Sequence, residues 1–235
     1  MHSVKNTKCV GVCGGEVLAV LVNKKIDALL EATSRSFYPT LKYLPKKIRG
    51  QIGLLYLLAR VADTIADSKH GETKILLDTL KQYNEVAQGR SDQLPDFSEI
   101  SEIQDNESEA ELLRNVQLVI DGLNEYSTPD RERILECLET IIGGQIIDLN
   151  RFGPAKEGGE ISSLSNNYEL DDYTFRVAGC VGVFWTKMSL SHLVKLKPGK
   201  EEEFFAKGIR FGKALQMINI LRDIPEDLRF GRCYI

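Results

Sequence analysis

The segment "IGLLYLLARVADTIA" (52–66) would be apolar on almost every face of a helix. A helix at the surface keeps a polar side, so a helix this apolar is typical of the centre of a bundle. Elsewhere in the chain helical periodicity is frequent, and the alternation typical of strands is nearly absent. The sequence therefore predicts an all-α fold with this segment as a central helix.

Helical periodicity recurs along most of the chain, without an internal repeat. Two long loops, one acidic (89–108) and one rich in Gly, Ser and Asn (150–168), interrupt a continuous helical pattern and are excursions rather than domain boundaries. We expect one helical domain over residues 24–235 and assign residues 1–23 to no domain. The predicted helices span residues 24–37, 45–67, 73–88, 109–126, 128–149, 169–196 and 200–222.

Helix boundaries have local signals at two places. The string "YPTLKYLP" (38–45) is expected to separate the first two helices as a loop. At "TPDRER" (128–133), Thr128 is expected to cap a helix and Pro129 to occupy its first turn.

Charge and cysteine content limit the partners and the compartment. The formal net charge of −4 gives no electrostatic reason to expect nucleic-acid binding. The apolar stretch "VLAVLV" (17–22) is too short to span a bilayer, although association with a membrane surface stays open. The five cysteines are odd in number and scattered, as expected for reduced thiols in the cytosol. We expect a cytoplasmic monomer.

Asp63 and Asp67 lie four residues apart in the predicted central helix, so their side chains project together. Two like charges repel there, and an apolar environment increases the penalty. Mg²⁺ would offset it, because this ion binds carboxylate oxygens and commonly completes its shell with substrate phosphates. Tyr56 and Arg60 can lie on the same stripe. Taken alone, the pair is better explained by a solvated face or by neutralisation by Arg60.

A second pair, Asp223 and Asp227, has the same spacing in "MINILRDIPEDLRFGR" (217–232). A continuous helix would align both aspartates with Asn219 in one oxygen-rich row. Gln216 precedes this row, and the basic residues near it are Arg222, Arg229 and Arg232.

Pro225 supports a competing interpretation of the second pair. Proline disfavours an uninterrupted helix, so Asp223 could instead cap a new helix, with Glu226 completing a capping box. A kinked helix would still permit metal binding.

Two helices that each offer a carboxylate pair to a bundle core commonly form a cation site. Basic residues accompany both pairs, so we expect a larger ligand than a bare ion. Carboxylates, Mg²⁺, a polyphosphate and arginines form a charge-balanced set. A diphosphate ester with a long apolar tail would also account for the apolar surroundings.

These motifs resemble the squalene/phytoene synthases, the head-to-head prenyl synthases of the isoprenoid-synthase fold. The resemblance covers roughly residues 26–235, and its motifs occur in the order of the family. The matching strings are "SRSF" (34–37), "YLLARVADTIAD" (56–67), "YTFRVAGCVG" (173–182) and "INILRDIPEDLRFGRCY" (218–234). The resemblance implies an isoprenoid-synthase-type bundle around a central cavity.

The resemblance also implies roles for individual residues. The implied metal ligands are Asp63, Asp67, Asn219, Asp223 and Asp227. The implied catalytic residues are Tyr56, Arg60, Asp63, Asp67 and Tyr173. The implied substrate-binding residues are Ser34, Arg35, Ser36, Phe37, Val177, Val181, Gln216, Arg222 and Arg232. For Gly179 and Gly182 we favour close helix packing over making room for a prenyl chain.

The implied reaction is Mg²⁺-dependent condensation of two prenyl diphosphates. "ADTIAD" (62–67) resembles squalene synthases, whereas "GRCYI" (231–235) resembles phytoene synthases. We favour squalene formation from two farnesyl diphosphates through presqualene diphosphate, for which the resemblance implies NADPH. Synthases of phytoene, dehydrosqualene or hydroxysqualene stay open, as does a non-catalytic helical binding protein. "SRSF" and the "VAG" segment argue against a head-to-tail prenyltransferase or a terpene cyclase.

The family usually continues past the second aspartate motif with further helices that close the cavity. We therefore expect that C-terminal helices of the family are missing beyond Ile235.

Overall fold

A computed structural model describes residues 23–34, 37–68 and 72–235 of the chain. The N-terminal segment that we assigned to no domain lies outside these residues up to position 22. The helices are α1 (Lys24–Ser34), α2 (Phe37–Tyr43), α3 (Arg49–Ala66), α4 (Thr73–Ala87), α5 (Ser98–Glu102), α6 (Glu107–Arg114), α7 (Val116–Asp121), the 3₁₀ turn η1 (Gly122–Glu125), α8 (Thr128–Phe152), α9 (Asn167–Thr174), the π-helical turn η2 (Phe175–Gly179), α10 (Cys180–His192) and α11 (Glu201–Arg229).

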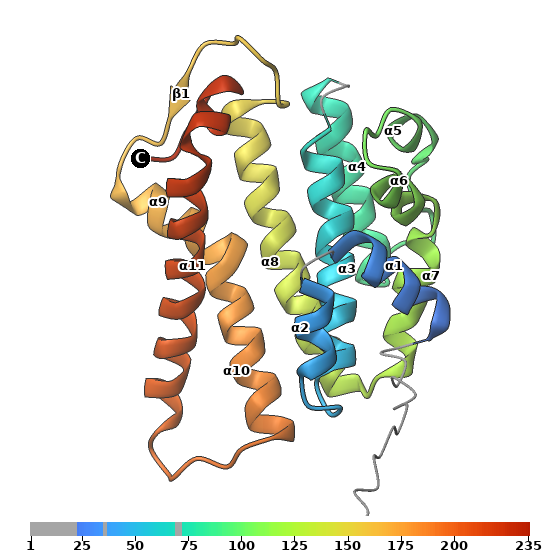
Figure 1. Ribbon diagram of the computed structural model, residues 1–235, viewed down its shortest axis with the longest axis vertical. Coiled ribbons are helices and arrows are strands. Elements are labelled where there is room, and N and C mark those ends of the chain that lie inside the picture. Colours follow the sequence, from blue (N-terminus) through green and yellow to red (C-terminus); the bar gives the residue numbers. More distant parts are fainter. Residues whose placement is uncertain (1–22, 35–36, 69–71) are drawn as a thin grey trace, which may run out of the picture.

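The long helices form a bundle in which α3 is central (Figure 1). Helix α3 packs against α8 and α4 on its sides and against α1, α6 and α7, while α8 also contacts α10, which pairs with α11. The α3 side chains Leu54, Leu57, Leu58 and Val61 are fully buried, which confirms the prediction of an apolar central helix. The all-α fold class is confirmed.

Strand structure among the described residues is limited to β1 (Ser162–Ser163) and β2 (Arg232–Cys233). These strands pair in parallel, with Ser162 opposite Arg232. The pairing ties the loop before α9 to the residues that follow α11.

Several predicted boundaries were wrong. The expected loop at 38–45 contains most of α2, where Pro39 is tolerated in the first turn and Tyr38 and Leu41 are buried. The acidic loop contains α5. The predicted helix 109–126 is divided into α6, α7 and η1, and η2 interrupts the predicted helix 169–196.

The ends of α8 and α11 also differ from prediction. Ser127, rather than Thr128, occupies the N-cap position of α8, although Pro129 does lie in the first turn. Helix α11 continues through Pro225 to Arg229, so Asp223 does not cap a new helix. Proline removes one helical hydrogen bond to the carbonyl of Leu221, and Leu221 is 57% exposed, so water can replace the donor.

Gly182 of α10 lies against Gly208 of α11, which agrees with the packing role that we favoured. A Cβ at position 182 would lie 2.1 Å from the backbone oxygen of Gly208, whereas one at Gly143 of α8 would lie 3.4 Å from the nearest atom, on the flexible Arg176 side chain. We expect Gly182→Ala to lower the free energy of unfolding by about 3 kcal/mol, because two backbones must separate.

Gly143→Ala is the matched control, and its expected effect is neutral or stabilising by up to about 1 kcal/mol through helix propensity. Urea denaturation of both variants measures the difference. Equal stability of the two variants would contradict the close contact between α10 and α11.

The described part of the chain has no helix with the length and apolar character needed to cross a membrane.

Candidate active site

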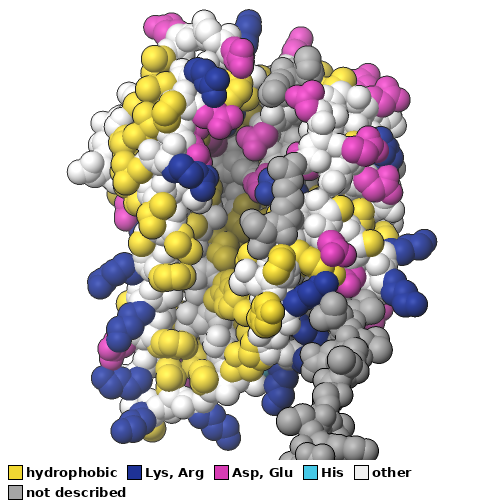
Figure 2. Space-filling model, in the orientation of Figure 1, with side chains coloured by type: hydrophobic (Ala, Val, Ile, Leu, Met, Phe, Trp, Pro, Cys, Tyr) yellow, Lys and Arg dark blue, Asp and Glu magenta, His cyan; other side chains and the backbone are white. Residues whose placement is uncertain are grey.

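A cavity of about 550 Å³ lies between α3, α8, α10 and α11. Its volume is in the range of small-molecule sites. Figure 2 shows the hollow on this face, with hydrophobic side chains inside it and acidic side chains above them. The apolar residues that line the cavity are Phe37, Ile52, Leu55, Ala59, Ala66, Ile141, Leu149, Val177, Val181, Phe184, Trp185 and Ile220.

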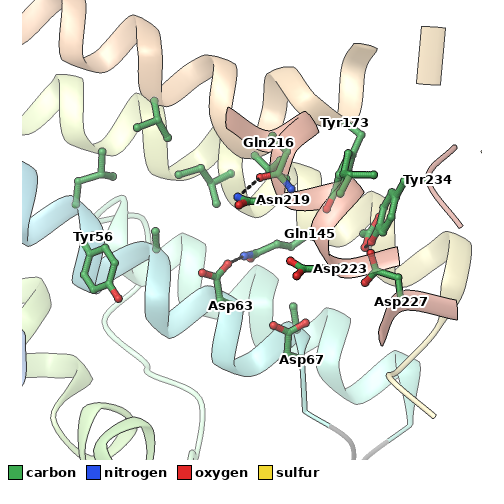
Figure 3. A pocket seen from close by; sticks show the side chains of 18 of the residues that line it. Tyr56, Asp63, Asp67, Gln145, Tyr173, Gln216, Asn219, Asp223, Asp227 and Tyr234 are labelled. Atoms are coloured by element: carbon green, nitrogen blue, oxygen red, sulfur yellow. Dashed lines mark hydrogen bonds between the residues drawn. The ribbon is translucent and has the colours of Figure 1, made fainter. Parts of the chain in front are cut away.

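The two predicted aspartate pairs meet at this cavity. Asp63 and Asp67 line it from the end of α3, and Asp223 and Asp227 line it from the end of α11. Figure 3 shows the two pairs on opposite sides of the pocket. Helices α3, α8 and α11 all run toward this end of the bundle in Figure 1, and this shared direction brings their last turns together.

The environment of the first pair is partly protein and partly solvent. Gln145 of α8 donates a hydrogen bond from its amide to Asp63 Oδ1. Burial raises the pKa of Asp63 to about 7, and the neighbouring charge of Asp67 adds to this rise. The side chain of Asp67 is 70% exposed. The solvated-face alternative therefore describes Asp67 but not Asp63.

Arg60 acts on the first pair only from a distance, and its charge lowers the pKa of both Asp63 and Asp67 against the effect of burial. Its guanidinium donates to the Tyr56 hydroxyl at 3.4 Å and forms no ion pair with Asp63 or Asp67, all of which are described. Arg60 lines a separate cavity of about 240 Å³ beside α5 and α6, whereas Tyr56 and Asp63 line the main one and Asp67 lines both.

The second pair has a cation beside it. Arg222 donates two hydrogen bonds of 2.6 Å to the carboxylate of Asp223, which holds the pKa of Asp223 below its usual value. Burial raises the pKa of Asp227, and the charge of Asp223 contributes to this. Asn219 also lines the cavity and donates to Gln216 Oε1 at 3.3 Å.

Arg232 links the first pair to α8. Its Nη1 lies 3.7 Å from Asp67 Oδ1 and 3.8 Å from Asp148 Oδ2. The Tyr234 hydroxyl donates to Asp148 at 2.7 Å, and the Tyr234 ring stacks on Tyr173 with 4.5 Å between centroids. Tyr173 therefore lies at the acidic end of the cavity, beside a cation and a second tyrosine.

Most of the other predicted site residues also line the cavity, namely Phe37, Val177, Val181, Gln216, Arg222 and Arg232. Ser34 does not line it, because its hydroxyl is buried and donates to the carbonyl of Leu30 within α1. Arg35 and Ser36 lie outside the described residues.

Sequence reasoning missed Gln145, Asp148 and Tyr234. The first two occur in the apolar run "IIGGQIIDL" (141–149), where two polar residues three apart share a helix face. The same reasoning that selected Asp63 would have selected them. Tyr234 belongs to the quoted string "GRCYI" (231–235), but its contact with Asp148 depends on the pairing of β2 with β1, which no local pattern shows.

The donor set fits Mg²⁺, which prefers oxygen ligands and is usually held by one or two carboxylates together with phosphate oxygens. Within the described ranges, no three carboxylate, histidine or cysteine side chains converge closely enough to hold an ion by themselves. Each pair could therefore hold an ion only with ligands from a substrate or water.

An all-α bundle around an acid-rimmed, apolar cavity is the isoprenoid-synthase fold, and solved structures share it. The complex of TcSQS with the ligand BPH1237 superposes with a TM-score of 0.64 at 22% sequence identity, over 86% of this chain and 53% of TcSQS. The complex of TcSQS with the ligand E5700 gives 0.63 at 22% identity.

The chain belongs to the squalene/phytoene synthase family, because the family model matches residues 30–235. It is 26% identical over 216 residues to squalene synthase ERG9 of Saccharomyces cerevisiae, covering 88% of this chain and 44% of the yeast protein. It is 28% identical over 213 residues to a bifunctional lycopene cyclase/phytoene synthase of Phaeosphaeria nodorum, covering 88% of this chain and 32% of that protein. The chain thus spans less than half the length of these curated relatives.

Proposed function

We propose that the chain carries out Mg²⁺-dependent head-to-head condensation of two farnesyl diphosphates, through presqualene diphosphate, to squalene. The observation that carries this proposal is the pair of aspartate rows on α3 and α11, which face one cavity with an apolar interior. A prenyl diphosphate has the matching polarity, with an anionic head and a long apolar tail.

Asp63, Asp67, Asn219, Asp223 and Asp227 would hold Mg²⁺. When bound, the ion stabilises the negative charge of departing diphosphate. Arg222 and Arg232 add positive charge at the same end, where charge-assisted hydrogen bonds to phosphate are strong.

The apolar walls have a separate role in this proposal. Val177, Val181 and Phe184 enclose the prenyl chain and exclude water from an allylic cation, which would otherwise be trapped as an alcohol. Tyr173, which lines the cavity, would stabilise a cation or handle a proton near the leaving diphosphate.

NADPH is part of this proposal only because the formation of squalene requires a hydride donor. The described residues contain no glycine-rich phosphate-binding turn between a strand and a helix, so no nicotinamide site is assigned. A phytoene, dehydrosqualene or hydroxysqualene synthase is the second candidate, favoured by "GRCYI" (231–235).

We expect the purified protein, in the presence of Mg²⁺, to convert radiolabelled farnesyl diphosphate to squalene and diphosphate only when NADPH is added as the hydride donor. The measurement separates the lipid products after parallel incubations with farnesyl and geranylgeranyl diphosphate, each with and without NADPH. Phytoene from geranylgeranyl diphosphate would support the second candidate. A protein that binds prenyl diphosphates without forming any product would support the non-catalytic alternative.

A further inference from the structure

Asp148 of α8 belongs to neither aspartate pair, yet it lies at the same end of the cavity. Its side chain is 13% exposed. One oxygen accepts the Tyr234 hydroxyl at 2.7 Å, and the other is buried without a hydrogen-bond partner among the described residues. A buried carboxylate beside a proposed anion site would repel the anion, so a compensating role is needed.

The residues that Asp148 contacts belong to a short C-terminal strap, which we define as Gly231–Tyr234. The strap is held by backbone hydrogen bonds from Ser162 to the Gly231 carbonyl at 2.9 Å and from Leu164 to the Cys233 carbonyl at 3.0 Å. Tyr234 of the strap is tied to α8 by the hydrogen bond that its hydroxyl donates to Asp148. Its ring also stacks on Tyr173 of α9.

Arg232 of the strap also lies next to the carboxylate of Asp148. Its side chain is 12% exposed and lies between Asp148 and Asp67, at 3.8 and 3.7 Å respectively. Its Nη2 donates to the carbonyl of Gly153 at 3.5 Å, whereas its buried Nε has no partner in the described structure. Without Asp148, the guanidinium would keep Asp67 at 3.7 Å and a weaker, longer-range interaction with Asp227.

We propose that Asp148 is a positioning residue, which clamps the C-terminal strap through Tyr234 and holds Arg232 toward the first aspartate pair. The second part of this inference rests on the proposed function, because it assigns Arg232 to a diphosphate. The clamp itself depends only on the contacts of Asp148, Tyr234 and Arg232.

Two variants separate the parts of the clamp. Asp148→Asn removes the charge but keeps an oxygen that can accept from Tyr234, whereas Tyr234→Phe removes the hydrogen bond and keeps the charge. Asp171→Asn is the matched control, because Asp171 is an exposed aspartate paired with Lys213. All three are compared in the full chain.

Hydrogen exchange measures the clamp independently of function. We expect Tyr234→Phe to accelerate exchange of the Ser162 and Leu164 amides about tenfold, because their acceptors lie on the strap. We expect Asp171→Asn to leave both amides unchanged. Unchanged exchange in Tyr234→Phe would overturn the clamp.

Calorimetric binding of inorganic diphosphate with Mg²⁺ measures the positioning of Arg232. We expect Asp148→Asn to weaken binding about tenfold and Asp171→Asn to leave it unchanged. Equal or tighter binding by Asp148→Asn would show that Asp148 acts only by repulsion and would overturn the positioning role. The two parts of the inference can fail separately. If the wild-type protein does not bind diphosphate but Tyr234→Phe still accelerates amide exchange, the proposed diphosphate site and the positioning of Arg232 by Asp148 are refuted. The clamp of the strap by Asp148 then still holds.

Discussion

Asp63→Asn and Asp223→Asn are each expected to lower product formation at least about 100-fold, while the free energy of unfolding changes by no more than about 1 kcal/mol. Each carboxylate lies one turn from another, so removing one relieves repulsion in the protein without metal. Asparagine at position 63 can still accept the hydrogen bond from Gln145. At position 223 the lost ion pair involves Arg222, whose side chain is 66% exposed, so the pair contributes little.

The measurement compares turnover at subsaturating Mg²⁺ with urea denaturation of the same preparations. The substitutions are made in a protein whose product formation has already been measured. If this chain forms no product, they are made in a longer polypeptide that does. Asp171→Asn is the control for removal of a charge outside the cavity. Near wild-type turnover in both aspartate variants would refute the metal-site proposal.

Asp130→Ala is expected to destabilise the fold by about 3–5 kcal/mol, the largest stability effect that we predict. Asp130 is 4% exposed at the start of α8. It accepts hydrogen bonds from Arg133 at 2.7 Å, from Gln51 of α3 at 3.1 Å and from His192 of α10 at 2.9 Å. Removing the carboxylate leaves these partly buried donors without their acceptor and loosens the contacts among three helices.

The contribution of Asp130 to the free energy of unfolding depends on pH in a direction that can be derived. Burial alone would raise the pKa of Asp130, but the hydrogen bonds from His192 and Gln51 outweigh it and leave the pKa below its usual value. The contribution is therefore fully present above the unfolded pKa of about 4 and is lost as the pH falls through the lower folded value. The stability difference between wild type and Asp130→Ala should shrink below about pH 4.

Urea denaturation at neutral and acidic pH tests both statements. Glu136→Ala is the control, because Glu136 pairs with Lys187 at the surface and its loss should cost less than about 1 kcal/mol. A loss below 1 kcal/mol for Asp130→Ala as well would contradict the role of this carboxylate in joining α3, α8 and α10.

The sequence by itself determined the helical fold class and the helices that are long and strongly periodic. Apolar spacing is a local property, so α3, α4 and α8 were predicted close to their observed bounds. The four-residue spacing within each aspartate pair likewise determined that the two side chains share a face.

Only the tertiary structure decided which of these faces meet. It placed Asp63 and Asp223 on one cavity and turned Arg60 toward another, although both Arg60 and Asp63 belong to the last turns of α3. It also continued α11 through Pro225 and brought Tyr234 to Asp148 across 86 residues of sequence. These outcomes depend on packing and on contacts distant in sequence, whose free energies can exceed the local preferences that a sequence pattern records.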